Sequence, residues 1–305
     1  MDMLRAKWAV GKFVCVGLDS ELGKIPDIIK NASKTPVATF NRAIVMATCD
    51  LVAAYKPNIA FYASRGEEGL RDLVKTVRMI NDVAPDVPVV LDIKRADIGN
   101  TNRGYVEEAF EIIGADAATV NPYFGSEALL PFLERRDKGI IILCRTSNKG
   151  AAEFQNRMVV VEEGEVQYQG VKRQVLDPTP TPTGEPAVSA VPFYQLVAHN
   201  VARKWNRHGN CALVVGATAP SELVNVRAIV GDGFPILIPG IGKQGGDLEA
   251  AVKAGMDSKG EGMIINSSSG IIFASNGDDF VKAARGETAK LHNEITQILK
   301  GAVTT

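Results

Sequence analysis

The chain of 305 residues, of which 46% are hydrophobic, is long enough for one large α/β domain or two ordinary ones. Its 35 acidic and 34 basic residues give a net charge of -1, so no long-range field would draw it to nucleic acid or to an anionic membrane. The N-terminus carries Arg5, Lys7 and Lys12, and no uncharged run reaches the roughly 18 apolar residues of a membrane helix, which predicts a cytoplasmic protein.

The cysteines and histidines lack the spacing of a metal site or a redox pair. The four cysteines are far apart, and three of them fall in strand-like runs, which predicts reduced core residues: Cys15, Cys49, Cys144 and Cys211. The histidines lie in helical or loop segments, away from any glycine-rich turn: His199, His208 and His292. These patterns predict no bound metal and no chemistry carried by histidine.

Eight short runs of branched apolar residues follow one another along the chain, at residues 13–19, 52–58, 88–94, 117–123, 139–147, 211–218, 235–242 and 262–269. Most are continuously apolar, which is typical of parallel strands buried on both faces. Segments with helical periodicity separate them, at 65–82, 126–136, 221–230 and 246–255, and the chain ends in an amphipathic helix near 280–302. This alternation predicts an α/β fold, a (β/α)8 TIM barrel, as one domain over residues 1–305.

An excursion of about residues 151–192 separates the fifth and sixth strands. It contains a possible hairpin, "RMVVVEEGEVQYQ", followed by "DPTPTPTGEP". Prolines cannot donate to a strand ladder, so the second segment is predicted to be an extended loop. We interpret the excursion as a flap and not as a separate domain.

The predicted strands end in polar residues. In a barrel of this kind the side chains that carry out chemistry lie at the carboxyl ends of the strands. The polar residues there are Asp19, Lys56, Asp92, Lys94, Asn121, Thr146, Ser147, Thr218 and Asn266. One polar strand end is unremarkable because a loop begins there, but charges at the ends of the first three strands together indicate a site.

The third strand ends in "LDIKRAD", which places two acids around one lysine. Asp92 and Lys94 are two positions apart, so alternation directs both side chains to one face. A buried ion pair often fails to repay its desolvation, which favours function over stability as its reason. Close carboxylates favour the ammonium form of Lys94, which argues against a Schiff base and suits it to stabilise negative charge and to donate a proton.

A glycine-rich turn, "PGIGKQGGD" at 239–247, follows the seventh strand and precedes a helix. Glycines let backbone amides turn inward, and the start of a helix adds partial positive charge. The end of the seventh strand is also the usual phosphate position in such barrels. The turn therefore predicts a phosphate cradle.

Taken in order, six segments resemble the orotidine 5'-phosphate decarboxylase family in its longer bacterial branch: "FVCVGLDS", "AYKPNIAFY", "LDIKRADIGNT", "LCRTSN", "VVGAT" and "PGIGKQGGD". The resemblance covers most of the chain. It implies decarboxylation of orotidine 5'-phosphate to UMP, the last step of pyrimidine nucleotide synthesis, without a metal or organic cofactor. It also implies a homodimer.

The resemblance implies roles for the matching residues. Asp92 would lie against the substrate carboxylate, and Lys94 would stabilise and protonate a carbanion at C6. Asp97 and Thr101 would be donated into the site of the partner subunit. Lys56 would belong to the catalytic set with Asp92, Lys94 and Asp97, because it would orient the charge network as well as bind the ribose with Asp19. The other implied binding residues are Asn58 near the ribose, Ser147 at the pyrimidine edge, and Gln244 with Gly245 at the phosphate.

One residue departs from this family pattern. Relatives in this branch usually have an arginine after the eighth strand, where this chain has Ser269. Serine can donate one hydrogen bond but carries no charge. We hypothesise that Lys243 partly replaces the missing guanidinium. The alternatives are an introduced substitution or a weakly bound phosphate.

Two other functions fit part of the pattern. A magnesium-dependent sugar-phosphate decarboxylase or hexulose-phosphate synthase would share the barrel and the D-x-K-x-x-D motif, but gives no reason for "LCRTSN" or for the segment around Lys56. A non-catalytic nucleotide-binding barrel would account for the Ser269 change, but the intact set of acids and lysines argues against it.

Overall fold

The computed structural model describes residues 1–161, 189–242 and 245–303, and within them eight parallel strands form one sheet. The strands are β1 (Val14–Gly17), β2 (Val52–Lys56), β3 (Val90–Arg95), β4 (Ala117–Val120), β5 (Gly139–Arg145), β8 (Cys211–Val215), β9 (Ile236–Pro239) and β10 (Met263–Ser267). Every residue of β1, β2, β4 and β8 is buried, as expected for strands covered on both faces. All eight predicted strands are confirmed.

The sheet closes into a barrel. Its hydrogen-bonded order is β2-β1-β10-β9-β8-β5-β4-β3, so β2 and β3 are the two ends. Parallel bridges from Tyr55 to Val89 and from Asn58 to Asp92 join those ends. The predicted (β/α)8 architecture is therefore confirmed, and its assignment as a single domain stays a prediction.

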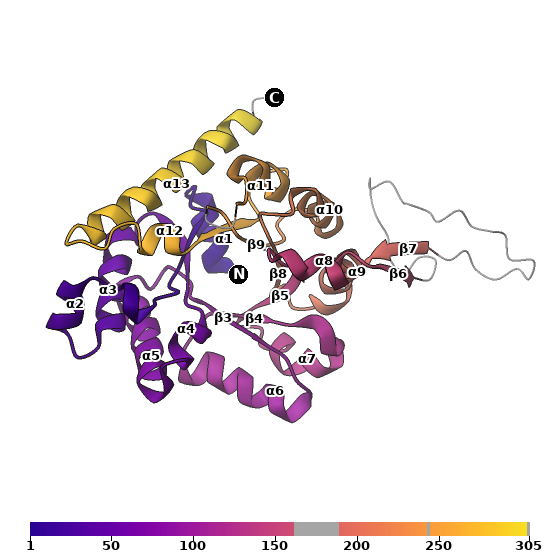
Figure 1. Ribbon diagram of the computed structural model, residues 1–305. Coiled ribbons are helices and arrows are strands. Elements are labelled where there is room, and N and C mark those ends of the chain that lie inside the picture. The colour runs from indigo at the N-terminus through magenta and orange to yellow at the C-terminus, as the bar shows by residue number, and fades with distance from the viewer. Residues whose placement is uncertain (162–188, 243–244, 304–305) are drawn as a thin grey trace, which may run out of the picture.

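Helices surround the strands (Figure 1). The main ones on the outside are α3 (Pro36–Thr48), α5 (Gly66–Val83), α6 (Gly99–Val106), α7 (Gly125–Leu133), α9 (Phe193–Asn200), α10 (Pro220–Val230), α11 (Leu248–Gly255) and α13 (Phe280–Val303). The five predicted helices correspond to α5, α7, α10, α11 and α13. Within the described ranges, no helix has both the length and the apolar character needed to cross a membrane.

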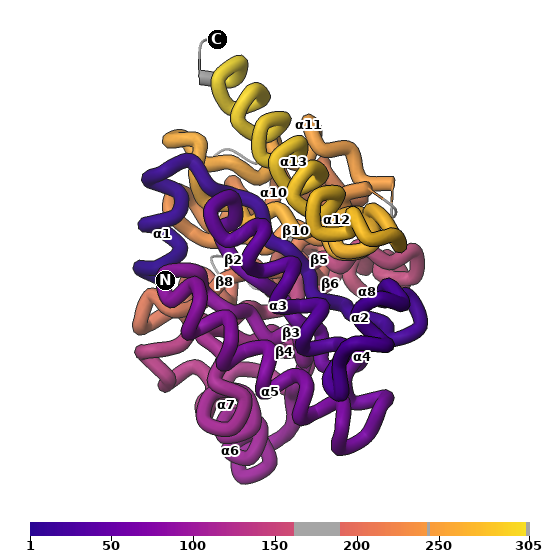
Figure 2. Tube along the Cα trace, turned by 90° about the vertical axis from the view of Figure 1, so that its left-hand side faces the viewer, coloured from indigo at the N-terminus to yellow at the C-terminus, as the bar shows by residue number. Residues whose placement is uncertain are grey.

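Helix α1 (Asp2–Ala9) closes the amino-terminal end of the barrel. Its Trp8 Nε1 donates to the Met263 carbonyl oxygen at 2.9 Å, and the Nζ of its buried Lys7 pairs with Asp86. Figure 2 shows α1 at one end and the short helices α2 (Asp27–Ala32), α4 (Ile59–Ala63), α8 (Ala152–Gln155) and α12 (Ser269–Ile272) at the other. The carboxyl ends of the strands therefore lie at the end of the barrel away from α1.

The two described strands of the excursion after β5 lie outside the barrel (Figure 1). Strand β6 (Met158–Val161) pairs antiparallel with β7 (Ser189–Pro192), which leads directly into α9. The predicted hairpin has its first arm at β6, and the remainder of that prediction lies outside the described residues.

Candidate active site

A cavity of about 700 Å³ opens at the carboxyl ends of the strands, a size typical of small-molecule sites. All eight strands contribute to it, β1 through Asp19, which follows that strand. The side chains from the other strands are Lys56, Asp92, Lys94, Thr119, Leu143, Val214, Leu237, Pro239 and Asn266. The cavity thus combines a charged wall with an apolar one.

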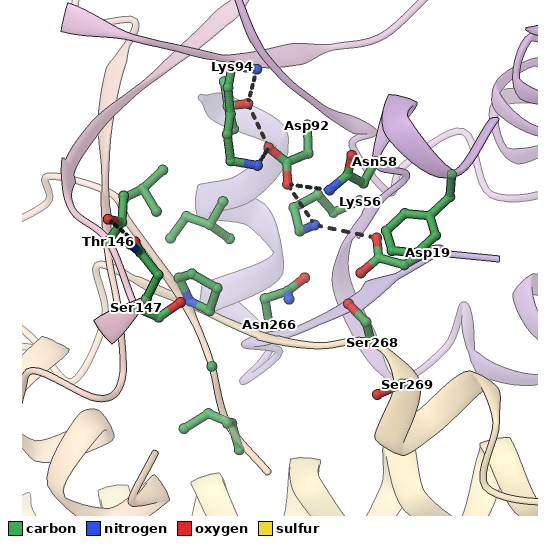
Figure 3. A pocket seen from close by; sticks show the side chains of 18 of the residues that line it. Asp19, Lys56, Asn58, Asp92, Lys94, Thr146, Ser147, Asn266, Ser268 and Ser269 are labelled. Carbon is green, nitrogen blue, oxygen red and sulfur yellow. Dashed lines mark hydrogen bonds and ion pairs between the residues drawn. The ribbon is translucent and has the colours of Figure 1, made fainter. Parts of the chain in front are cut away.

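Acids and lysines alternate along the charged wall (Figure 3). Lys56 Nζ lies 3.9 Å from Asp19 Oδ1 and 3.2 Å from Asp92 Oδ2. Lys94 Nζ lies 2.6 Å from Asp92 Oδ1. Two carboxylates and two amines are thereby gathered within one cluster. No group of three or more His, Cys, Asp or Glu side chains in the described ranges is arranged to hold a metal ion.

Each oxygen of the Asp92 carboxylate accepts two hydrogen bonds. Oδ1 accepts from Lys94 Nζ and from the Thr119 hydroxyl at 2.8 Å, and Oδ2 accepts from Lys56 Nζ and from Asn58 Nδ2 at 3.4 Å. Burial alone would raise the pKa of Asp92, but the charges of Lys56 and Lys94 and these hydrogen bonds outweigh it and lower the pKa to about 2. Asp92 is therefore an ionised carboxylate that is 8% exposed.

Lys56 is the most buried member of the cluster, with 4% of its surface exposed. Burial favours the neutral amine, but the charges of Asp92 and Asp19 outweigh it and raise the pKa of Lys56 above its ordinary value. On β1, burial raises the pKa of the Cys15 thiol to about 12. Lys56 is thus a fixed cation, and the neighbouring cysteine is a thiol and not a nucleophile.

Lys94 occupies an unusual backbone conformation. Its φ of 49° is the only positive value for a non-glycine residue in the described ranges. It lies where the pairing of β3 with β4 changes register. Half of the Lys94 side chain (47%) remains exposed, so its Nζ meets both Asp92 and the open cavity.

Ser147 lies on a tightly supported loop after β5. Its carbonyl oxygen accepts from the Thr218 hydroxyl at 3.1 Å, and the neighbouring Thr146 amide donates to Gln155 Oε1 on α8 at 2.8 Å. Gly216 packs directly underneath, because a Cβ there would lie 2.6 Å from the Ser147 Cα. The glycine keeps Ser147 at the rim of the cavity.

The glycine-rich turn and the start of α12 line the far end of the cavity. Gly240 and Gly242 have φ values of 104° and 84°, which only glycine adopts readily. Ser269 lies on this side together with Ser268, whose Oγ would be 1.9 Å from a Cβ on Gly17. The missing side chain of Gly17 therefore gives Ser268 the space in which it packs beside the cavity.

The structure brings seven predicted residues to one cavity: Asp19, Lys56, Asn58, Asp92, Lys94, Ser147 and Ser269. Gly245 has φ 81° in the turn beside it, and its amide donates to the Gly242 carbonyl oxygen. Asp97 and Thr101 are not among the residues that line the cavity of their own chain. Lys243 and Gln244 lie outside the described residues.

Sequence reasoning assigned no role to Thr119 or Asn266. Thr119 is the only polar residue of β4, which is the one signal that could have singled it out. Asn266 is 6% exposed, and its Oδ1, like Asp19 Oδ1, accepts no hydrogen bond within the described chain. These two oxygens leave the cavity with unused hydrogen-bond acceptors.

Comparison with known sequences links this cavity to one family. A family model described as "Orotidine 5'-phosphate decarboxylase / HUMPS family" matches residues 12–180. The chain is 42% identical over 297 residues to the orotidine 5'-phosphate decarboxylase of Cellvibrio japonicus, with 97% of each chain covered. It is 43% identical over 298 residues to the enzyme of that name from Ralstonia nicotianae, again with 97% of each covered.

Solved structures agree with the sequences. The OMP decarboxylase of Leishmania donovani superposes with a TM-score of 0.75 at 32% identity, covering 98% of this chain and 97% of that one. A putative orotidine-monophosphate decarboxylase from Toxoplasma gondii gives a TM-score of 0.76 at 31% identity, covering 100% and 98%. The similarity extends over the whole length of the barrel.

Proposed function

This chain belongs to the orotidine 5'-phosphate decarboxylase family, and we propose that its cavity decarboxylates orotidine 5'-phosphate to UMP without a cofactor, through a C6 carbanion. The observation that carries this proposal is the alternating cluster Asp19–Lys56–Asp92–Lys94 within one cavity. It offers an ionised carboxylate and an amine side by side at the place where a substrate carboxylate would leave.

Asp92 and Lys94 would act on the reacting carbon. The substrate carboxylate, placed against the ionised Asp92, is repelled in the bound state, and this repulsion disappears when CO2 leaves. The C6–carboxylate bond breaks, its electron pair stays on C6, and Lys94 as an ammonium ion stabilises that pair and transfers a proton to it. The exposed part of Lys94 lets the amine recover a proton from solvent.

The apolar wall suits the departing group. Leu143, Val214 and Leu237 line the same cavity as the charged cluster. Neutral CO2 is tolerated against such a surface, whereas a carboxylate would lose hydration there. The wall therefore favours the state after bond cleavage.

The remaining polar residues would bind the non-reacting parts of the nucleotide. The unused oxygens of Asp19 and Asn266 require donors, and the ribose hydroxyls are donors that the substrate supplies. Lys56 and Asn58 lie on the same side, and Ser147 would contact the pyrimidine edge. Binding energy at these ends would offset the cost of forcing two carboxylates together.

The phosphate would lie at the glycine-rich turn, near Gly245 and Ser269, with Gln244 and Lys243 as further contacts. Lys24, which also lines the cavity, is a second cation near this end. Its Nζ lies 5.7 Å from the ring centroid of Phe273, the residue that follows α12. Lys24 Nζ also pairs with Glu21 Oε1 at 2.5 Å, so a bound phosphate would share this cation with a carboxylate.

The functional unit is proposed to be a homodimer in which Asp97 and Thr101 serve the partner subunit's site. Neither residue lines the cavity of its own chain, and Asn102 fixes the loop by accepting from the Asp97 amide at 3.0 Å and donating to the Ala128 carbonyl oxygen at 2.6 Å. Exposed apolar side chains lie in this loop and in or just before α7, the helix that packs against α6: Ile98 (63%), Tyr123 (81%), Phe124 (50%) and Leu130 (44%). Such a patch is typical of a protein interface.

One assay tests this function against its rivals: the absorbance change of orotidine 5'-phosphate with purified protein, with and without EDTA. Equal turnover in both samples is expected. Turnover that EDTA abolishes would favour a metal-dependent sugar-phosphate enzyme, and binding of UMP without turnover would favour a nucleotide-binding barrel. The cytoplasmic location stays a prediction.

A further inference from the structure

The Thr119 hydroxyl, on β4, makes three hydrogen bonds beneath the charged cluster. It donates to Asp92 Oδ1 at 2.8 Å, and its oxygen accepts from the amides of Ile93 and Lys94, each at 3.0 Å. Thr119 is 1% exposed and lines the cavity. One proton and two lone pairs are all that a hydroxyl offers, so its bonding capacity is used completely.

The two amide bonds hold an irregularity in β3. The ladder pairs Leu91 with Ala118 and then Arg95 with Val120, so β3 advances four residues while β4 advances two. Because of the extra residues, the amides of Ile93 and Lys94 do not donate to backbone carbonyl oxygens of β4. Both amides donate to the Thr119 hydroxyl oxygen instead. The same bulge contains the positive φ of Lys94, a conformation that a lysine adopts only when its surroundings impose it.

The third hydrogen bond fixes the direction of the hydroxyl proton. Because both lone pairs accept from backbone amides, the proton can point only toward Asp92. This bond completes the four donors around the Asp92 carboxylate and orients Oδ1 toward Lys94 Nζ. A single side chain thus controls the backbone of Lys94 and the carboxylate of Asp92.

We propose that Thr119 is a positioning residue for decarboxylation, whose hydroxyl holds the β3 bulge and the Asp92 carboxylate so that Lys94 meets the reacting carbon. This inference rests on the proposed function. Thr119 acts at the reacting end, whereas the ribose and phosphate contacts that dominate binding lie elsewhere in the cavity. Loss of the hydroxyl should therefore reduce kcat more than it changes KM.

The test compares Thr119→Val, which keeps the volume but lacks the hydroxyl, with Thr119→Ser, which keeps the hydroxyl. Thr119→Val is expected to lower kcat at least about tenfold with KM changed less than about threefold, and Thr119→Ser to stay within about threefold of wild type in both. The matched control is Thr288→Val on α13, a fully buried hydroxyl bonded to the Ala284 carbonyl oxygen. It should lower Tm and leave kcat unchanged.

A Thr119→Val enzyme with wild-type kcat, or a Thr119→Ser enzyme as impaired as Thr119→Val, overturns the inference while the proposed function stands. If Thr119→Val does not fold, Thr119→Ala replaces it, and equal kcat values for the Ala and Ser variants overturn the inference. A wild-type protein that leaves orotidine 5'-phosphate unconverted overturns the proposed function, and this inference with it.

Discussion

Lys94 Nζ lies 2.6 Å from Asp92 Oδ1, although the backbone between the two residues bulges out of the strand. The other oxygen of Asp92 lies 3.2 Å from Lys56. A carboxylate between two amines stays ionised and cannot serve as an acid. Among these three residues, Lys94 is therefore the one placed to deliver a proton.

Replacing Lys94 by alanine should abolish most of the turnover. Lys94→Ala removes the proton donor and the cation that stabilises the carbanion, so kcat is expected to fall about 10²- to 10⁴-fold. Binding of UMP, measured by calorimetry, should change little because the ribose and phosphate contacts remain. Lys253→Ala, which removes an exposed lysine on α11, is the control and should leave kcat unchanged. Retained turnover in Lys94→Ala would exclude the carbanion mechanism proposed for this residue.

Asp92 should stabilise the fold in a pH-dependent way. Its pKa is lowered to about 2 in the folded state, so its contribution is complete above the unfolded value near 4 and is lost as the pH falls toward 2. Asp92→Asn also leaves Lys56 buried without its nearest counter-charge, and a loss of about 2–5 kcal/mol is expected at pH 7. Urea unfolding at several pH values measures this. A stability difference from wild type that does not shrink below about pH 4 would contradict the assignment.

The barrel could be predicted because each strand can be recognised from its own stretch of sequence. Strands such as β1 and β8 are buried along their whole length, and this burial appears directly as uninterrupted apolar runs. The shared cavity of Asp19, Lys56 and Asp92 followed from the rule that parallel strands end at the same face.

The contact between Asp92 and Lys94 has a different cause from the one predicted. Alternation along a regular strand places both side chains on one face, as expected, but the 2.6 Å contact forms across a bulge with a positive φ. The amides of Ile93 and Lys94 in that bulge donate to Thr119, 26 and 25 residues away on the next strand. A pattern within β3 alone contains no information about this partner.

Ser269 should limit the affinity for the phosphate. Ser269→Arg introduces a guanidinium that can bind phosphate through two hydrogen bonds, so KM for orotidine 5'-phosphate is expected to fall about tenfold or more. Ser269→Met, which adds length without charge, is the control and should not lower KM.

Lys243→Ala and Lys24→Ala should each raise KM for orotidine 5'-phosphate with little change in kcat. An unchanged KM in Lys243→Ala would show that this lysine does not replace the arginine.

Gly216 should be intolerant of even one added methyl group. In Gly216→Ala the new Cβ would lie 2.6 Å from the Ser147 Cα, so the loop must move and the Ser147 hydroxyl with it. A displacement of about 1 Å can cost up to about 100-fold in kcat/KM, and a lower Tm is expected as well. Gly286→Ala on α13 is the matched control, because its Cβ meets open space and should stabilise the helix by about 0.5–1 kcal/mol. Wild-type kinetics in Gly216→Ala would mean that Ser147 does not contact the substrate.

Sharing of sites between subunits can be tested by mixing inactive chains. In a dimer of Lys94→Ala with Asp97→Ala, one site keeps Lys94 from its own chain and receives Asp97 from the partner subunit, and the other site lacks both. Random exchange in equal amounts should therefore restore about a quarter of the wild-type activity.

The matched control mixes Lys94→Ala with Asp92→Ala. Both residues belong to the cluster of the same chain, so every site in the mixed dimer lacks one of them and no activity should return. Native mass spectrometry establishes that the chains have exchanged. Recovery in the first mixture but not in the second would assign Asp97 to the partner's site, because only a residue acting across the interface can be supplied by the other chain. Exchanged dimers that stay inactive in both mixtures would show that Asp97 acts within its own chain and is not supplied across the interface.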